Sequence, residues 1–373
     1  MKTVRSINTS GTHYQLGWQH GLQVKDLRVL ILNAIKSRMK TLGNLKKSDS
    51  LIKELLEELQ SIAIPTINMI QGQADALDID FPTLFKYAVA SYLEDNLLSS
   101  GTKTAEGCST WAASNGATSD GGPILVKNRD YYLEHFPLQI VIKAKPEKGY
   151  RYICVGSAGS PGVFGSGMNE TGLCVADTRV RCLDHGPGLP GYSLMMHILE
   201  EYREVASALD YLKEVNRMGG SNLIIADAEG DLAVLEVGHR NYGLVKPGNH
   251  LVVNTNHFVS LDLKAQFVDT NPPGTRGNSF HRYDKLEDEL RASYGRIDLR
   301  LARRLMASHD GMLSAICRHQ ESINAKGAGT ISTAIYLPAK REMLFCNGKP
   351  CQGKYQIFSI SGKIETKEDE EPD

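Results

Sequence analysis

The strongest constraint on the fold of this chain is an abrupt change in sequence pattern at Gly107. Before that residue, apolar side chains recur at helical spacing over 14–42, 48–64 and 81–98. After it, short runs rich in Val, Ile and Tyr alternate with turns of Gly, Asn and Asp, which is typical of antiparallel strands joined by hairpins. We therefore expect a helical part that ends at Gly107 and a strand-rich part that begins at Cys108.

The strand-rich part also contains helical stretches, so an α+β fold of layered antiparallel sheets is predicted. Helices are expected at 193–215, 279–291 and 299–306. Strands are expected at 109–114, 124–127, 138–144, 150–155, 172–177, 222–226, 232–237, 242–246, 251–254, 332–337 and 342–347. The acidic residues from about 365 to the end are expected to form a flexible tail.

Charge and composition narrow the class of function. The 373 residues include 42 Lys and Arg against 43 Asp and Glu, so the formal net charge is −1 and a nucleic-acid partner is not expected. The sequence contains no apolar run of membrane-spanning length and no signal-peptide core, so we expect a cytoplasmic location and no membrane partner. The composition is compatible with a homo-oligomer.

Seven scattered cysteines lack any Cys-x-x-Cys pair, which favours reduced thiols over a disulfide framework or a structural zinc site. His185, His197, His239 and His250 show no metal-ligand spacing, so they are not expected to bind a metal. The cysteine chemistry described below requires neither a metal nor an organic cofactor, so none is expected. Cys317 and His319 flank Arg318, and on a helix residues this close in sequence would point apart rather than form a pair.

The junction between Gly107 and Cys108 carries the clearest chemical signal. If this peptide bond were cut, Cys108 would hold both a thiol and an α-amine, whose reference pKa of about 7.7–8.0 suits a base for the thiol. The same thiol could perform the cut, because attack on the uncrowded Gly107 carbonyl gives a thioester that water hydrolyses. The alternative interpretation is an ordinary buried thiol that follows a linker.

Two later segments could complete such a site. Lys127-Asn128-Arg129-Asp130 ends the second strand of the first predicted hairpin and would therefore lie near Cys108 across the pair. Asp130 could there bind and orient a free α-ammonium group. The segment 254–258 ends another strand, and its asparagines could donate hydrogen bonds to an oxyanion.

These residues resemble the N-terminal-nucleophile hydrolases. The most similar branch is the acyl-coenzyme A:6-aminopenicillanic acid acyltransferases (the isopenicillin N acyltransferase type), related to bile-salt hydrolases and penicillin V acylases. The resemblance rests on Gly107-Cys108-Ser109-Thr110 followed by Asn128-Arg129-Asp130. Further blocks follow in the family's order at 14–21, 167–173, 255–258, 279–282 and 314–319, so the resemblance spans about residues 14 to 336.

The resemblance implies a four-layer αββα sandwich made as a precursor that cleaves itself. Residues 1–107 would be a helical prosegment that stays as a partner chain, and residues 108–373 would be the catalytic chain. Cys108 would be the nucleophile, Asp130 would hold its α-amine, and Asn256 would donate to the oxyanion. The residues expected to support the site or bind substrate are Lys127, Asn128, Arg129, Thr178, Arg179, His257 and Arg282. Arg282 would either steady the site or bind a substrate carboxylate, and His257 is expected to be structural.

Two departures bear on the substrate. Lys127 stands where bile-salt hydrolases have Arg, and the long prosegment is absent from those enzymes, so both features favour the acyltransferase branch. Ala328, within Lys326-Gly327-Ala328-Gly329-Thr330, stands where that branch has a basic residue, which argues against penicillin precursors. The expected substrate is therefore a small N-acyl amide or an acyl-CoA, processed through a Cys108 thioester by hydrolysis or acyl transfer.

Two other classes of protein remain as alternatives. The first is a relative that binds a small molecule, is not catalytic and stays uncleaved. The second is a papain-like cysteine peptidase that uses Cys108 with a remote histidine, although the Cys-Gly-Ser/Ala-Cys-Trp block of that family is absent.

Overall fold

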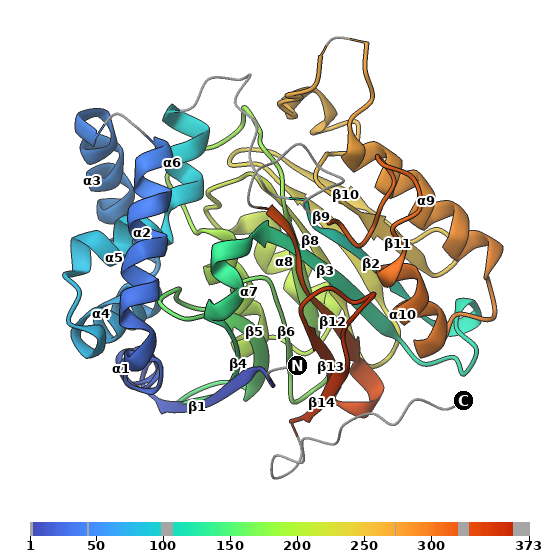
Figure 1. Ribbon diagram of the computed structural model, residues 1–373, viewed down its shortest axis with the longest axis horizontal. Coiled ribbons are helices and arrows are strands. Elements are labelled where there is room, and N and C mark those ends of the chain that lie inside the picture. The colour runs from blue at the N-terminus through green and yellow to red at the C-terminus, as the bar shows by residue number, and fades with distance from the viewer. Residues whose placement is uncertain (1–2, 43–44, 98–106, 273, 320–327, 361–373) are drawn as a thin grey trace.

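The computed structural model describes residues 3–42, 45–97, 107–272, 274–319 and 328–360 (Figure 1). The predicted tail from about residue 365 lies outside the described residues, as do Lys326 and Gly327.

The first part of the chain is a strand followed by a layer of helices. Its elements are β1 (Arg5–Gly11), α1 (His13–Gln23), α2 (Arg28–Leu42), α3 (Leu45–Ile62), α4 (Ile64–Leu77), α5 (Phe81–Ala88) and α6 (Ala90–Leu97). Thr12 opens α1 with a capping box shared with Gln15, and Asp80 caps α5 by accepting from the Thr83 amide. Pro65 lies in the first turn of α4, where its missing N–H costs nothing, so it begins a helix that the sequence pattern did not predict.

The second part supplies most of the strands. They are β2 (Ser109–Ala113), β3 (Ile124–Tyr132), β4 (Gln139–Pro146), β5 (Tyr152–Ser157), β6 (Ser166–Asn169), β7 (Cys174–Arg179), β8 (Ser221–Ala226), β9 (Leu232–Val237), β10 (Tyr242–Val245), β11 (Leu251–Asn254), β12 (Ala328–Leu337), β13 (Glu342–Asn347) and β14 (Tyr355–Ser359). The helices of this part are α7 (Gly191–Glu201), α8 (Val205–Glu214), α9 (Asn278–Ala292) and α10 (Leu299–Ala307). The predicted strands and helices are all present, whereas β6 and β14 were not predicted.

Within the described residues, the strands form two sheets. One has the order β1-β4-β5-β6-β7-β8-β9-β10 and the other the order β11-β2-β3-β12-β13-β14. All the pairings are antiparallel except that β1 lies parallel to β4. The first hundred residues were expected to be helical, but β1 adds an edge strand from this part to the larger sheet, which ties it to the strand-rich part of the chain.

Helices cover the outer faces of the two sheets (Figure 1), and three apolar layers lie between the four layers, so the fold is an αββα sandwich, as predicted. Along β4, Ile140 packs against the N-terminal helices and α7, while Val141 packs between the two sheets. Along β2, Ala112 faces the larger sheet and Trp111 faces α9 and α10. Each sheet thus buries both faces, because successive side chains of a strand point to opposite sides.

Among the described residues, every helix is too short or too polar to cross a bilayer.

Candidate functional site

Cys108 lies directly before the first residue of β2, in the interior of the smaller sheet. Ser109 is paired with Asn128 and Thr110 with Lys127, so Cys108 is level with Arg129 and Asp130 in the last part of β3. The sequence-based expectation that this segment lies beside Cys108 is therefore met. The Cys108 side chain is buried, with 8% of its surface exposed.

Gly107 lies near Asp130, the carboxylate that was expected to hold the α-amine. A Cβ atom built on Gly107 would lie 3.3 Å from Asp130 Oδ2 and would collide with the guanidinium of Arg318. Asp130 is fully buried and accepts hydrogen bonds from Thr330 Oγ1 at 2.6 Å and from Arg318 Nη1 at 3.4 Å. The bond between Gly107 and Cys108 thus lies near a buried carboxylate, and glycine at 107 leaves room for the Arg318 guanidinium that contacts Asp130.

Arg282 binds the chain where β2 begins. Its Nη1 donates to the Cys108 carbonyl at 2.6 Å and to Ser109 Oγ at 2.7 Å, and its Nη2 donates to Asn256 Oδ1 at 2.8 Å. Burial lowers the pKa of Arg282 to about 10, with the nearby Arg318 adding to the effect. These contacts favour a steadying role for Arg282 over the binding of a substrate carboxylate.

The Asn256 amide is oriented at both ends. Its Nδ2 donates to the Arg179 carbonyl at 2.9 Å, its Oδ1 accepts from Arg282, and its main-chain N–H donates to Ser279 Oγ at 2.8 Å. The second N–H of Nδ2 is not used by these contacts, so an oxyanion donor role requires that this hydrogen point toward the substrate.

The groups around Cys108 shift the pKa of its thiol in opposite directions. Burial raises the pKa of Cys108, while the positive charge of Lys127 and the main-chain N–H of Asp130 act to lower it. Lys127 Nζ is held by Asp177 Oδ1 at 2.5 Å and by the Gly165 carbonyl at 2.9 Å. Burial also raises the pKa of Asp130, against the lowering effects of Arg318 and Arg282. The thiol therefore needs a nearby base before it can act as a nucleophile.

Cys108 and Asp130 line a cavity of about 120 Å³. Its wall is formed partly by the N-terminal helices, through Arg38 of α2, Tyr87 of α5 and Ser91 of α6, and partly by the strands and α7. This arrangement makes the first hundred residues part of the pocket.

Arg129 differs from the neighbouring cations of this pocket in its hydrogen bonding. Lys127 pairs with Asp177, Arg38 pairs with Glu94, and Arg179 pairs with Asp95. Arg129 is 5% exposed, and among the described residues neither Nη1 nor Nη2 has a hydrogen-bond partner. Its guanidinium stacks over the rings of Tyr131 and Phe164, with the Cζ atom 5.3 and 4.9 Å from the ring centroids. Burial lowers the pKa of Arg129.

The remaining predicted residues form hydrogen bonds around the site. Asn128 donates to the Met306 and Ile316 carbonyls and accepts from Thr333, so it turns away from the pocket. Thr178 donates to the Thr255 carbonyl and accepts from Asn222 and Asn254.

Arg179 and His257 form further contacts around the site. Arg179 lines the pocket and pairs with Asp95 of α6. His257 Nδ1 contacts Ser279 Oγ at 2.8 Å, and burial lowers the pKa of His257 to about 4, so the ring is neutral at pH 7.

Sequence reasoning missed the partners of Asp130 and misjudged one pair. Arg318 and Thr330 converge on Asp130 from segments far along the chain, and only the presence of Arg318 in a family-like block hinted at a role. Cys317 and His319 were not expected to face each other, but their segment is not helical. Cys317 Sγ therefore lies 3.7 Å from His319 Nε2, and the expectation was wrong.

Comparison with protein families gives one match. The family model described as acyl-coenzyme A:6-aminopenicillanic acid acyl-transferase matches residues 117–352. The match includes Asp130, Asn256 and Arg282 and begins beyond Cys108. No curated protein matches the sequence of this chain.

The solved structures that resemble the chain include two mutants of conjugated bile acid hydrolase from Clostridium perfringens. Each is 15% identical and covers 70% of this chain and 97% of its own, with TM-scores of 0.49 and 0.47. Penicillin V acylase from Agrobacterium tumefaciens is 14% identical and covers 70% of this chain and 80% of its own, with a TM-score of 0.39.

Proposed function

The chain belongs to the acyl-coenzyme A:6-aminopenicillanic acid acyl-transferase family, an acyltransferase and amidohydrolase family, and from this we propose that it is a self-activating cysteine enzyme. Its substrate is a small N-acyl amide or an acyl-CoA, and Cys108 takes up the acyl group as a thioester. The observation that carries the proposal is the position of the Gly107–Cys108 bond near the buried Asp130 carboxylate, at the wall of a pocket.

Activation begins with the Cys108 thiol. Its sulfur attacks the Gly107 carbonyl, the peptide C–N bond breaks, and the proton lost by sulfur goes to the departing nitrogen. Water then hydrolyses the thioester, leaving the Gly107 carboxylate and a Cys108 that carries both a free thiol and an α-amine. The amine lies beside Asp130, whose carboxylate holds and orients it.

The mature site uses the same atoms on an outside substrate. The α-amine removes the thiol proton, which offsets the raised pKa of the buried Cys108, and sulfur attacks the substrate carbonyl. Asn256 Nδ2 stabilises the resulting oxyanion. Water or an amine then resolves the thioester, giving hydrolysis or acyl transfer. The N-terminal chain stays in place because α2, α5 and α6 line the pocket.

The state of Arg129 supports an anionic substrate. A guanidinium that is buried without a hydrogen-bonded anion is costly, and each neighbouring cation named above already has a carboxylate. A substrate carboxylate near the scissile bond would satisfy Arg129 and would orient the carbonyl toward Cys108.

The proposal is tested by the mass and N-terminal sequence of the purified chain. The wild type should give two chains, the second of which begins Cys-Ser-Thr-Trp, and Cys108→Ala should stay intact and inactive. Cys182→Ala, a buried cysteine outside the pocket, serves as the matched control and should process normally. Cleavage of Cys108→Ala at the same bond would show that an outside protease is responsible and would contradict self-activation.

The choice of an anionic substrate has its own test. N-acyl amides that carry a carboxylate should lose about 30-fold in kcat/KM with Arg129→Met, equivalent to about 2 kcal/mol. The matching methyl esters should be poor substrates of both proteins. Equal losses for acid and ester would show that Arg129 only supports the fold.

A further inference from the structure

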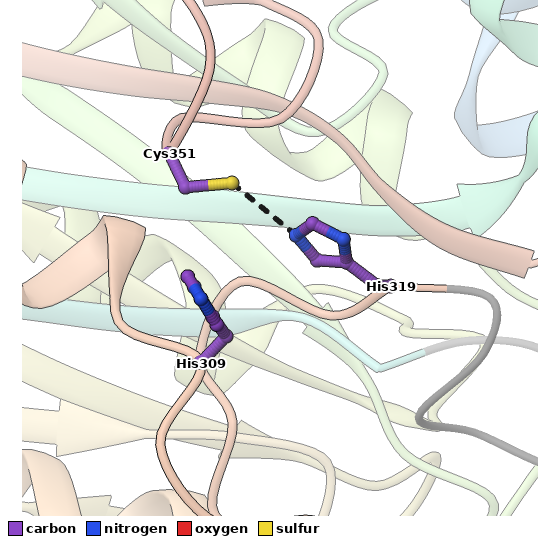
Figure 2. A group of neighbouring side chains, drawn as sticks. All are labelled: His309, His319 and Cys351. Carbon is purple, nitrogen blue, oxygen red and sulfur yellow. Dashed lines mark hydrogen bonds between the residues drawn. The ribbon is translucent and has the colours of Figure 1, made fainter.

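Four side chains outside the pocket gather at one place on the surface of the smaller sheet. We call this group the thiol–imidazole cluster; its members are His309, Cys317, His319 and Cys351. They come from the loop after α10, from the segment before residue 320, and from the loop between β13 and β14. Figure 2 shows the side chains of His309, His319 and Cys351 directed toward one shared space.

We propose that the thiol–imidazole cluster binds a zinc ion. Two thiols and two imidazoles are the ligand set of structural zinc sites, which are closed and tetrahedral. Nothing in the acyl-transfer chemistry uses these four residues directly, so the zinc proposal does not rest on the proposed function.

The spacing of three members matches the edges of a zinc tetrahedron. With Zn–S bonds of about 2.3 Å and Zn–N bonds of about 2.0–2.1 Å, two sulfurs lie about 3.8 Å apart, and a sulfur and a nitrogen about 3.6 Å apart. The observed separations are 3.6 Å between Cys317 Sγ and Cys351 Sγ, and 3.7 Å between Cys317 Sγ and His319 Nε2. The third edge, from His319 Nε2 to Cys351 Sγ, is 3.2 Å. One ion can therefore reach all three atoms with small movements.

His309 would supply the fourth ligand. The ligand atoms of His309, His319 and Cys351 all lie within 4.8 Å of one another, whereas Cys317 is not part of that group, so His309 has to move toward Cys317 for one ion to bind all four. His309 Nδ1 lies 3.2 Å from the Ala307 carbonyl, and donation to that oxygen leaves Nε2 with its lone pair free. Metal-binding histidines commonly make such a bond with their other nitrogen. The residue is exposed on a loop, so its ring can close the remaining distance.

Charge is compatible with a divalent ion. Two thiols that release their protons to solvent leave two thiolates, which neutralise Zn²⁺. One group opposes binding: Lys349 Nζ lies 3.3 Å from His319 Nδ1, which must carry a proton when Nε2 binds the metal. Lys349 therefore has to turn away when zinc binds.

Zinc at this place would fix the segment that presents Arg318 to Asp130. Cys317 and His319 flank Arg318, whose main-chain N–H donates to Thr330 Oγ1 at 2.8 Å and whose guanidinium contacts Asp130. The ion thus has a structural role, and it acts on the pocket only by holding this segment.

The test measures zinc stoichiometry on the full chain. The protein is treated with a chelator, dialysed, titrated with zinc chloride against a chromogenic chelator, and titrated separately with cobalt chloride. All measurements are repeated in Cys108→Ser, so that the thiol of the pocket cannot contribute. We expect one zinc per chain, a tetrahedral cobalt spectrum with thiolate charge-transfer bands, and a melting temperature about 3 °C or more higher with zinc.

Variants distinguish zinc binding at this cluster from non-specific zinc binding. Cys351→Ser and His309→Ala should lower zinc affinity at least about tenfold, while Cys346→Ser, a neighbouring buried cysteine outside the cluster, should bind like the wild type. If Cys351→Ser does not fold, protection of Cys351 from alkylation by zinc in the wild type gives the same answer. A folded, reduced protein that binds no zinc would overturn the proposal. So would zinc binding that is equal in Cys351→Ser and Cys346→Ser, or a Cys317–Cys351 disulfide in its place.

Discussion

Two groups of thiols in this molecule lie in contrasting surroundings: Cys108 in the pocket, and Cys317 with Cys351 in the thiol–imidazole cluster. Cys108 is buried among ionised groups, with Lys127 acting to lower its pKa and Asp130 acting to raise it. Cys317 and Cys351 lie against each other and against imidazoles, and burial raises the pKa of Cys317 to about 12. The first arrangement suits a single nucleophile whose charge must change during a reaction. The second suits a set of donors that change charge only when a cation arrives.

The backbone around the two sites differs as well. Cys108 directly precedes β2 and Asp130 lies in β3, two paired strands in the interior of a sheet, where the register fixes the position of each residue. The cluster is assembled from loops that converge only in the folded chain. Catalysis requires a geometry that is fixed beforehand, whereas a metal can help to assemble its own ligands.

The largest effect is expected from Asp130→Asn. This change removes the charge that holds the α-amine and leaves Arg318 buried without its carboxylate. Both self-cleavage and turnover of a reporter amide should therefore fall by about 10²-fold or more. Mass spectrometry follows cleavage and a product assay follows turnover.

Thr330→Val is the graded control for Asp130. It keeps the Asp130 charge and deletes the hydroxyl that donates to Asp130 Oδ1 and accepts from the Arg318 main-chain N–H, so a loss of about tenfold is expected in both measurements. Full activity in Asp130→Asn would show that the amine is held by another group.

Acid should lower the stability of the fold through His257, a buried histidine near the Cys108 site. The pKa of His257 is lowered to about 4 by burial, whereas the unfolded chain titrates near 6.5. Between these values the unfolded state binds a proton that the folded state does not, so stability falls as pH falls from 6.5 toward 4, by on the order of 3 kcal/mol.

Urea unfolding at several pH values measures this loss. His257→Gln should be less stable at pH 7 but should lose less stability between pH 6.5 and 4 than the wild type. Buried His20 and His135, each with a pKa lowered to about 3, keep part of the slope in both proteins. Identical slopes would mean that His257 is not neutral and enclosed as described.

Gly107→Ala should separate cleavage from turnover. The new Cβ would meet the Arg318 guanidinium, so self-cleavage should slow by about tenfold. Turnover per cleaved molecule should be unchanged, because residue 107 ends on the other chain. Gly191→Ala, also at the pocket wall but with its nearest contact at 3.8 Å from Ser221 Oγ, should cleave at the normal rate. A turnover defect in cleaved Gly107→Ala would contradict the assignment of the new chain ends.

Much of the fold could be predicted because periodicity and turn residues are local signals. The limits of β9, β11 and β13 match the prediction, and the register of β2 with β3 brings Asp130 beside Cys108 as expected. β1 was missed because a parallel edge strand is defined by its partner β4 and not by its own residues.

The site was predicted in part for the same reason. Cys108 and Asp130 belong to one hairpin, so their proximity follows from local pairing. The contacts of Arg318 and Thr330 with Asp130 depend on how the chain returns to the sheet nearly 200 residues later. Cys317 and His319 were judged by helical geometry, which does not apply to their loop, and their partner Cys351 has no spacing signal at all.

The smallest effect concerns Lys349 and the proposed zinc ion. Its ammonium lies against His319 Nδ1 and repels an incoming cation, although solvent screens a charge at this half-buried position. Lys349→Met should therefore raise zinc affinity by about threefold, measured by competition with a chromogenic chelator. Lys354→Met, an exposed lysine on the same loop, should leave the affinity unchanged. Weaker binding in Lys349→Met would show instead that the ammonium positions the His319 ring, and the two thiol sites would then both depend on a lysine.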